Sequence, residues 1–347
     1  MCFAVFVFVN GGIIVSVNVA INGFGYIGRL AFRQMFGSAD FKIVAVNDLT
    51  DCKTIAHLLK YDSAQGRYDR DIKSTEDTLI VDGEKIAVFS EKTPESLPWQ
   101  ELKVDVVLEC SGRFAFLVAS SSHIKAGAKK VVISAPAGSD VPMVVFGVNE
   151  NILNKSHNII STGSCTTNCL APMAKALNEL AQIEKGFMTT LHAYTSDQNL
   201  LDAPHARGDL RRARSAANNI VPTGTNAAKA IGQVLPELSG KLDGTSQRVP
   251  VITGSLTELV AVVKGNITRE QINEAMKATS NESFGYNEDD IVSSDIIGSK
   301  FGSLFDSTQT KVSDLGENTL VKVAAWYDNG NSYVSQMVRT IRYFSGI

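Results

Sequence analysis

The sequence predicts an α/β protein with two domains, a doubly wound parallel sheet followed by an α+β domain with a mixed or antiparallel sheet. The chain has 347 residues, and globular domains commonly span about 100–200 residues. In the first half, short β-branched segments alternate with helical patterns, which is typical of parallel βαβ units. After Ser164 the strand segments become longer and alternate in polarity, which favours a mixed or antiparallel sheet.

The composition disfavours several classes of protein. Hydrophobic residues make up 44% and charged residues 20%, so the chain is not disordered. The net charge of −3 disfavours nucleic acid as the main partner. Because no stretch reaches the ~18–20 consecutive apolar residues of a membrane helix, we expect no membrane partner. Five cysteines are too few for a disulfide scaffold, so reduced thiols and a cytoplasmic location are the simpler expectation.

Residues 1–15 form an atypical apolar extension ahead of the first domain. A secretory signal has a positively charged start, but no Lys or Arg precedes Arg29. Two interpretations stay open. The β-branched and aromatic residues around Asn10-Gly11 indicate a strand–turn–strand, or the segment is an unstructured or artefactual extension.

The first domain is predicted to span residues 16–164. Its strands are expected over 17–21, 42–46, 104–108 and 130–133. A Gly-rich turn follows the first strand, and a helix is expected from about Arg29. The polar section from Asp62 to Gln100 has strand signals at 79–81 and 86–89, and we expect an insertion in the doubly wound pattern there.

The second domain is predicted to span residues 165–331. Its longer strands are expected over 187–194, 254–263 and 319–326. Thr268 and Gln271 have the spacing of a capping box that opens a helix. The last helix, 332–347, has an apolar stripe and is expected to pack back on the first domain.

A dinucleotide motif follows the first predicted strand. In Gly23-x-Gly25-x-x-Gly28, the first glycine allows a tight turn, the second lets the backbone approach a pyrophosphate, and the third permits close helix–strand packing. Asp48 ends the second strand, where its carboxylate can accept hydrogen bonds from a ribose and repel a 2′-phosphate, which favours NAD over NADP. The alternative is that the glycines only make a turn and Asp48 only caps a helix.

A candidate nucleophile precedes the helical pattern of residues 170–180. Cys165 would lie at a helix N-terminus, where the dipole and free amides would lower the thiol pKa from its usual ~8.5. Cys169 would lie one turn further in and pack in the core. The alternative for Cys165 is a small buried hydrophobic residue. Because no second Cys/His cluster accompanies the pair, we predict no metal site.

His192 is the best candidate base, by elimination among five histidines. It lies in a strand that ends in polar residues able to face a cleft. His57 is expected to pack within a helix, His123 and His157 lie in polar contexts that suggest exposure, and His205 lies in a charged loop.

Basic residues supply candidates for anion binding. The cluster from Arg207 to Arg214 is interpreted mainly as a solvated or subunit-contact surface. Arg248 is isolated before Val249-Pro250 at the approach to a strand, which favours a role as a clamp for an oxyanion or phosphate.

Together these residues resemble the phosphorylating, NAD-dependent, bacterial-type glyceraldehyde-3-phosphate dehydrogenase family. The resemblance runs from about Val17 to Phe344, and its most specific parts are the segment Ser164–Asn168 and the downstream segment His192–Thr195. It rests on the segments Asn22–Leu30, Asn47–Leu49, Leu59–Ser63, Ser164–Pro172, His192–Thr195 and Trp326–Asn329.

The resemblance implies a role for each matching residue. Cys165 would attack the aldehyde of glyceraldehyde 3-phosphate, with His192 as base, and inorganic phosphate would then release an acyl phosphate from a thioester. The implied phosphate contacts are Ser164, Thr166 and Thr225, beside Asn226, for the attacking phosphate, and Thr195, Arg212 and Arg248 for the substrate's own. The implied NAD contacts, besides the glycines, are Tyr26, Ile27, Asp48, Lys92, Ser134 and Asn329. The family is a homotetramer in which the Arg207–Arg214 loop reaches a neighbouring subunit's cofactor site.

The chain departs from the family pattern at several positions. Tyr26 replaces Arg, which predicts weaker cofactor binding. Asn226 replaces Gly, where it would crowd the phosphate or adopt a left-handed backbone. Gly330 replaces Glu, and the segments 114–117 and 251–252 also differ. Three alternatives therefore stay open: erythrose-4-phosphate dehydrogenase, a catalytically impaired NAD-binding homologue with an interaction role, and a cofactor-free Cys/His hydrolase.

Overall fold

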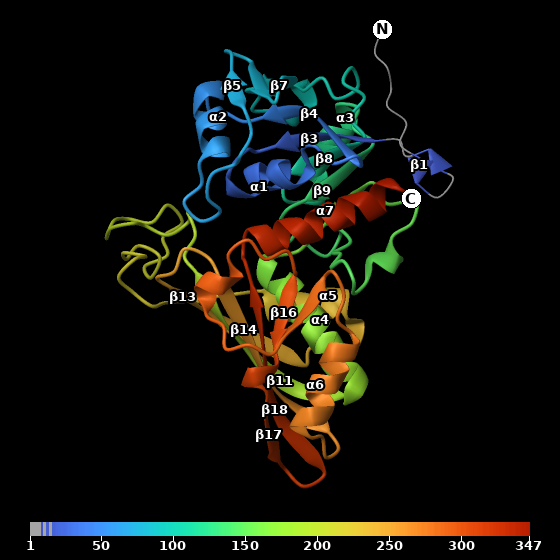
Figure 1. Cartoon of the computed structure of the whole chain (residues 1–347), viewed down its shortest axis with the longest axis vertical. Coiled ribbons are helices and arrows are strands. Elements are labelled where there is room, and N and C mark those ends of the chain that lie inside the picture. The colour runs from blue at the N-terminus through green and yellow to red at the C-terminus, as the bar shows by residue number, and fades with distance from the viewer. Residues whose placement is uncertain (1–7, 10–11, 14–15) are drawn as a thin grey trace. The chain divides into compact units, whose positions relative to one another are not determined.

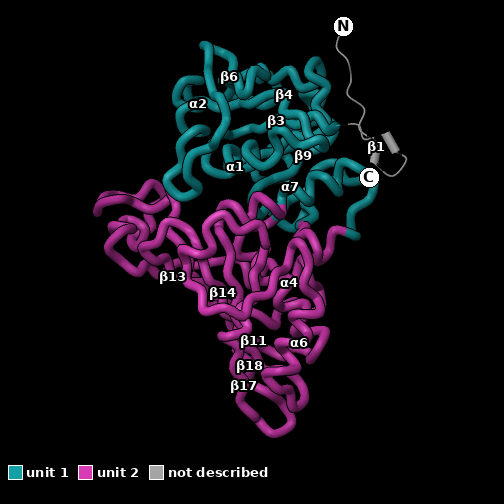
Figure 2. Tube along the Cα trace, viewed as in Figure 1, with its two compact units in different colours: residues 1–143, 151–162, 337–347 teal, residues 144–150, 163–336 magenta. Residues whose placement is uncertain are grey.

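A computed structural model describes residues 8–9, 12–13 and 16–347 (Figure 1). The chain divides into two compact units, the first formed by residues 1–143, 151–162 and 337–347 and the second by residues 144–150 and 163–336 (Figure 2). The predicted domain limits of 16–164 and 165–331 stay a prediction. Near the N-terminus, β1 (Phe8–Val9) pairs antiparallel with β2 (Gly12–Ile13), and the other residues of the 1–15 extension lie outside the described residues.

The first unit contains an eight-stranded sheet in the order β10-β9-β8-β3-β4-β7-β6-β5. Neighbouring strands from β10 to β7 are parallel, which confirms the predicted doubly wound class. Its strands are β3 (Val17–Asn22), β4 (Phe41–Asn47), β5 (Ile72–Ser74), β6 (Thr78–Val81), β7 (Glu84–Phe89), β8 (Val106–Glu109), β9 (Lys130–Ile133) and β10 (Ile159–Ser161).

The polar section from Asp62 to Gln100 extends this sheet. Its strands β5, β6 and β7 are joined by antiparallel pairing, and β7 continues the parallel sheet beside β4. The strand order reverses at β3, which lies between β4 and β8. Open α/β sheets bind ligands at such a point, beyond the carboxyl ends of the strands.

Among the described residues, three α-helices belong wholly to the first unit, and one of them begins earlier than predicted. They are α1 (Tyr26–Met35), α2 (Cys52–Lys60) and α3 (Leu117–Lys125). Helix α1 begins at Tyr26, three residues before the predicted Arg29, because Gly25 already forms its N-cap with an extended backbone. The side chain of Asp51 caps α2 by accepting a hydrogen bond from the Thr54 N–H.

The second unit contains a mixed sheet in the order β12-β13-β11-β14-β18-β16-β15, with β17 on β18, which confirms the predicted class. Strands β11 and β13 are parallel, whereas β11, β14 and β18 are joined antiparallel. Its strands are β11 (Ile183–Ala193), β12 (Val221–Gly224), β13 (Leu242–Val249), β14 (Ser255–Lys264), β15 (Phe284–Asn287), β16 (Ser303–Asp306), β17 (Lys311–Asp314) and β18 (Asn318–Tyr327).

The helices of the second unit pack on its sheet. Helix α4 contacts β11, β14, β16 and β18, and α5 contacts β13. The predicted capping box of Thr268 and Gln271 is confirmed at the start of α6. The helices are α4 (Cys165–Leu180), α5 (Ala227–Val234), α6 (Arg269–Ala278) and α7 (Asn331–Ser345), and the boundary between the units falls within α7.

Apolar side chains remain exposed along the central strands of the second unit. Phe187 on β11 is 73% exposed, and its register partner Val260 on β14 is 39% exposed. Leu191 and Leu320 are also exposed on these strands. In the part of the chain that the structure describes, no helix has the length and apolar content needed to cross a membrane.

Candidate active site

Cys165 is the first residue of α4. The preceding Ser164 is the N-cap, and its Oγ accepts a hydrogen bond of 3.1 Å from the Thr167 N–H. The Sγ atom of Cys165 lies 3.3 Å from Nε2 of His192 on β11. The structure thus brings together a thiol and an imidazole that are 27 positions apart in the sequence.

The hydrogen bonds of His192 define which of its nitrogens acts as a base. Nδ1 lies 2.7 Å from the carbonyl oxygen of Ala193, which can only accept, so Nδ1 carries the hydrogen. Arg248 Nη1 lies 3.0 Å from Nδ1, but a guanidinium can only donate, so this contact is not a hydrogen bond when the shorter contact to Ala193 places the hydrogen on Nδ1. Arg248 donates instead to the Ala193 oxygen and to Thr195 Oγ1. Nε2 therefore presents a lone pair to Cys165, as a general base requires.

Burial and charge act on both groups of this pair. Burial lowers the pKa of His192 to about 3, with a further contribution from the positive charge of Arg248, so the imidazole is neutral. Burial also raises the pKa of Cys165, against the opposing effects of Arg248 and of hydrogen bonds from Thr166. The lowered thiol pKa expected from the sequence is therefore wrong, because loss of solvation outweighs those favourable contacts.

The residues predicted for the substrate phosphate form one hydrogen-bonded chain. Arg248 donates to Thr195, whose Oγ1 donates to Asp197, and Asp197 pairs with Arg212. Burial alone would raise the pKa of Asp197, but Thr195, Arg212 and Arg248 together lower it. Arg248 thus adjoins the Thr195 hydroxyl beside His192, and Arg212 lies on the other side of Asp197. Guanidinium and hydroxyl groups of this kind suit a phosphate.

The hydroxyls predicted for the attacking phosphate lie at two helix starts. Ser164 Oγ is 2.8 Å from Thr167 Oγ1, at the start of α4. Thr225 accepts a hydrogen bond from the Ala227 N–H at the start of α5, which packs against α4. Asn226 is exposed with φ −93°, so the left-handed backbone considered for this position is wrong.

Tyr327 is a site residue to which the sequence assigned no role. Its buried hydroxyl lies 3.0 Å from Thr166 Oγ1 and 2.8 Å from Thr190 Oγ1. Its ring stands edge-on to His192 with 5.9 Å between centroids, and burial raises its pKa. The available signals were its place directly after the predicted strand 319–326 and within the segment Trp326–Asn329 that carries the resemblance.

Asn329 follows β18 in the second unit and has a fixed amide orientation. Its Oδ1 accepts hydrogen bonds from Thr253 Oγ1 at 3.0 Å and from Ser255 Oγ at 3.2 Å. Ser255 Oγ also accepts from the Ala193 N–H, so it connects the strand of His192 to Asn329. The amide NH2 of Asn329 therefore points away from both hydroxyls, and sequence reasoning missed Thr253 and Ser255.

The glycines of the dinucleotide motif have different steric surroundings. Gly23 has φ +92°, and a Cβ there would lie 2.5 Å from the Ser111 nitrogen. A Cβ on Gly28 would lie 2.2 Å from the Gly23 oxygen. A Cβ on Gly25 would meet nothing within 4 Å, so open space adjoins this residue, as a pyrophosphate would need.

Asp48 and the start of α1 adjoin the glycine motif in the first unit. Asp48 Oδ2 accepts a hydrogen bond of 2.6 Å from the Phe24 N–H, and Oδ1 accepts one from Thr50. Tyr26 and Ile27 lie in the first turn of α1, at the positive end of the helix dipole, which favours anions. These residues fit a dinucleotide.

The two remaining predicted cofactor contacts also follow strands of the first unit. Lys92 is exposed in the segment after β7. Ser134 follows β9, and its N–H donates to the Glu109 carbonyl at 3.0 Å.

Two of the other histidines differ from expectation. His123 is fully buried, between Trp99 and Glu109, because α3 turns it toward the sheet. His57 is exposed on α2, with its ring beside Tyr61. Within the described residues, no group of three or more His, Cys, Asp or Glu side chains could hold a metal ion.

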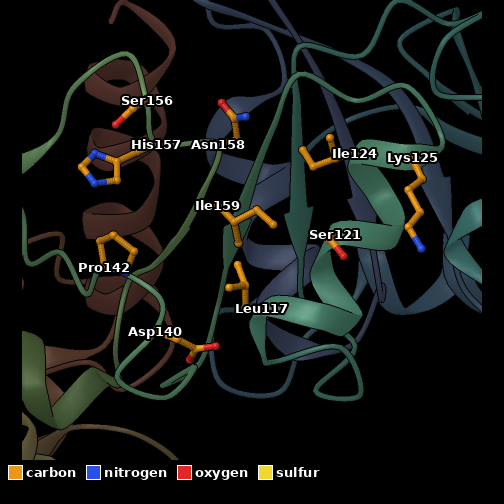
Figure 3. Close-up of a pocket in the computed structure, with 10 residues that line it drawn as sticks. All are labelled: Leu117, Ser121, Ile124, Lys125, Asp140, Pro142, Ser156, His157, Asn158 and Ile159. Carbon is orange, nitrogen blue, oxygen red and sulfur yellow. The ribbon is translucent and has the colours of Figure 1, made fainter.

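A pocket of about 420 Å³ in the first unit is formed by none of the predicted site residues. Figure 3 shows His157 and Lys125 on opposite sides of Ile159. Lys125 pairs with Glu95, and His157 Nδ1 accepts from the Asn154 N–H. The pocket is lined by Leu117, Ser121, Ile124, Lys125, Asp140, Pro142, Ser156, His157, Asn158 and Ile159.

Comparison with known proteins identifies the family. Residues 17–116 match the model "Glyceraldehyde 3-phosphate dehydrogenase, NAD binding domain", and residues 164–329 match that of the C-terminal domain. A glyceraldehyde-3-phosphate dehydrogenase of Clostridium pasteurianum is 59% identical over 329 residues, covering 95% of this chain and 98% of that protein. Proteins of the same name from Clostridium acetobutylicum and Streptococcus pyogenes are 58% and 57% identical, each over 95% of this chain and over 98% and 99% of their own lengths. The chain belongs to the glyceraldehyde-3-phosphate dehydrogenase family.

Proposed function

We propose that the chain is an NAD-dependent, phosphorylating dehydrogenase that converts glyceraldehyde 3-phosphate to 1,3-bisphosphoglycerate in glycolysis. One observation carries the proposal: the Cys165 thiol faces the unprotonated Nε2 of His192 at 3.3 Å, with Arg248 and Thr195 beside the imidazole. A nucleophile, a base and an anion site adjoin one another, as oxidation of a phosphorylated aldehyde through a thioester requires.

Cys165 and His192 perform the covalent steps. The sulfur of Cys165 bonds to the aldehyde carbon, and its proton passes through His192 Nε2 to the former carbonyl oxygen, giving a hemithioacetal. NAD, held by the residues of the glycine motif, would supply the acceptor for the hydride that leaves this carbon. His192 takes the hydroxyl proton in that step, and a thioester remains on Cys165. Inorganic phosphate then attacks the thioester carbon, and the carbon–sulfur bond breaks. His192 returns its proton to the sulfur, so the thiol is restored as the acyl phosphate leaves.

Hydroxyl and guanidinium groups hold the two phosphates. Arg248, Thr195 and Arg212 bind the phosphate of the substrate, because charge-assisted hydrogen bonds from Arg suit its oxygens. Three hydroxyls and the adjacent Asn226 bind the attacking phosphate near the starts of α4 and α5. Those hydroxyls belong to Ser164, Thr166 and Thr225.

NAD is held mainly by backbone groups of the glycine motif. Gly25 leaves room for the pyrophosphate next to the N–H groups of Tyr26 and Ile27. Asp48 accepts hydrogen bonds from the adenosine ribose and disfavours NADP by repelling a 2′-phosphate. The other proposed contacts are Lys92, Ser134 and Asn329, with the Asn329 amide on the nicotinamide.

The enzyme is a cytoplasmic homotetramer in this proposal. Exposed Phe187, Leu191 and Val260 on the central strands support burial of that face against another subunit, since contiguous apolar surface commonly marks an interface. The loop from Arg207 to Arg214 reaches a neighbouring subunit's cofactor site. Cys52, Cys110, Cys165 and Cys169 are free thiols among the described residues, which supports a reducing compartment.

The test is formation of reduced nicotinamide from glyceraldehyde 3-phosphate, with and without inorganic phosphate, with NAD or NADP. Reduction of NAD that depends on phosphate is expected, with little reduction of NADP. Cys165→Ser should lower turnover by about 10⁴-fold or more while NAD still binds. Faster turnover of erythrose 4-phosphate would instead indicate the tetrose enzyme. Folded protein that binds NAD without turnover would indicate the impaired homologue suggested by Tyr26, Asn226 and Gly330.

A further inference from the structure

A buried polar network crosses the carboxyl ends of the central strands of the first unit. Glu109, the last residue of β8, is 1% exposed, and His123 on α3 is fully buried. His123 Nε2 lies 3.0 Å from Glu109 Oε2, and the Trp99 indole nitrogen lies 3.0 Å from His123 Nδ1. Ser111 donates to Glu109 Oε1 from both its N–H and its hydroxyl, and Asn22 Nδ2 donates to Oε2.

The donor and the acceptor of each hydrogen bond in this network are determined by the chemistry of the side chains. The Trp99 indole can only donate, so His123 Nδ1 must accept, and the ring hydrogen resides on Nε2, from which it is donated to Glu109. Glu109 then receives hydrogen bonds from His123, Asn22 and Ser111, four in all, which satisfies both of its oxygens. A carboxylate accepts at every lone pair, and no other side chain of the same size does so.

The network continues to the residues that precede the proposed cofactor contacts. Asn47 Nδ2 donates to Asn22 Oδ1 at 2.7 Å, and Asn47 exchanges two hydrogen bonds with the backbone of Glu91. Asn22, Asn47 and Glu91 immediately precede Gly23, Asp48 and Lys92 respectively.

Ser111 connects the network to the glycine turn from the other side. A Cβ on Gly23 would lie 2.5 Å from the Ser111 nitrogen, so the turn after β3 and the segment after β8 are in direct contact. Glu109 holds that segment by two hydrogen bonds to Ser111.

We propose that Glu109 and His123 are positioning residues for the cofactor, which hold Gly23, Asp48 and Lys92 in the arrangement that binds the ADP half of NAD. This inference rests on the proposed NAD-dependent function. Neither side chain touches the reacting atoms, so their loss should weaken NAD binding and spare the chemical step.

The test compares isosteric variants for NAD affinity and turnover. Glu109→Gln replaces one carboxylate oxygen by an NH2 group, which faces a hydrogen-bond donor and cannot accept from it. His123→Leu removes both ring nitrogens. Each should raise the Kd for NAD and for ADP-ribose by about tenfold or more, because hydrogen bonds to the buried carboxylate are lost. The kcat at saturating NAD should stay within about threefold of wild type. His123→Gln should recover most of the affinity, since its amide can accept from Trp99 and donate to Glu109.

Glu95→Gln is the matched control. It removes a carboxylate that pairs with Lys125 on the same helix α3, but at the surface. Its Kd for NAD should equal that of wild type.

Three results would overturn the inference. The first is an unchanged Kd for NAD in both Glu109→Gln and His123→Leu. The second is an equal loss of NAD affinity in His123→Leu and His123→Gln. The third is a lowered kcat with an unchanged Kd for NAD. If Glu109→Gln does not fold, the two His123 variants decide. A wild-type chain that neither binds nor reduces NAD would instead overturn the proposed function, and this role with it.

Discussion

At the residue scale, the chemistry depends on how His192 is surrounded. Its side chain is buried, its Nδ1 is bonded to Ala193, and Arg248 adds a positive charge nearby. Burial and the charge of Arg248 disfavour the protonated imidazole and outweigh the hydrogen bond to Ala193, which favours it, so the pKa is lowered and the ring stays a neutral base. A histidine in water would be partly charged near neutral pH.

The lowered pKa of His192 predicts a pH-dependent stability. Its folded-state pKa of about 3 lies below the ~6.5 of an unfolded chain. Between those values the unfolded chain binds the extra proton, so acid lowers the free energy of unfolding by at most about 1.4 kcal/mol per pH unit. The free energy of unfolding is therefore unaffected by this group above about pH 6.5 and decreases as the pH falls from there toward 3.

Urea unfolding of wild type and His192→Asn between about pH 4 and 7 checks this. The variant should lose stability less steeply as the pH falls. Parallel curves for the two proteins would show that His192 is not held neutral.

Tyr327 permits a second prediction at this scale. Tyr327→Phe keeps the ring beside His192 but removes the hydroxyl between Thr166 and Thr190. Two buried hydroxyls lose a partner, so the free energy of unfolding should fall by about 1–3 kcal/mol. Denaturant unfolding measures the change, and a stability equal to wild type would mean that water replaces the lost hydroxyl.

At the scale of elements, the glycines between β3 and α1 have different roles, one in folding and one in binding. Gly28 packs against the Gly23 carbonyl, whereas Gly25 adjoins open space with an ordinary φ of −68°. The same motif therefore contains one glycine required by the fold and one that serves the ligand.

A pair of alanine variants tests this difference. Gly28→Ala should destabilise the first unit by about 2 kcal/mol or more, because its Cβ would overlap the Gly23 oxygen. Gly25→Ala should unfold like wild type but bind NAD about tenfold more weakly, since the methyl group occupies the space of the pyrophosphate. Thermal unfolding and NAD titration distinguish the two, and a destabilised Gly25→Ala would contradict the assignment.

At the scale of the whole molecule, the uncovered strands of the second unit predict self-association. Phe187 is opposite Val260 in the sheet, and both are exposed in the single chain. An aspartate at position 187 would place an unpaired charge in the proposed interface, where it costs at least about 3 kcal/mol.

Analytical ultracentrifugation of Phe187→Asp should therefore show smaller species than wild type. Val118→Asp is the control, because Val118 is 76% exposed on α3 of the first unit. A wild-type chain that sediments as a monomer, or a Phe187→Asp tetramer, would contradict the interface.

The sequence was sufficient for the features that depend on neighbouring residues. The strands of the first unit, the capping box of α6 and the glycine motif are local patterns of side-chain polarity and backbone freedom. Helix α1 was placed three residues late because the N-cap at Gly25 uses backbone conformation and no capping side chain. The strand at 86–89 was predicted within the polar section after Asp62, but its pairing with β4 in the parallel sheet was not.

Tertiary structure decided which distant residues meet. Strand register places His192 beside Arg248, and packing of α4 on the sheet brings Cys165 to the same point. His123 looked exposed in the sequence, yet it is buried on Glu109 because the orientation of α3 determines which side of the helix faces the sheet. The pKa of the Cys165 thiol is raised and not lowered as expected, because its burial is a property of the whole fold. Local sequence specifies secondary structure and motifs through short-range backbone and side-chain preferences, whereas solvation and contacts between remote positions exist only once the chain has folded.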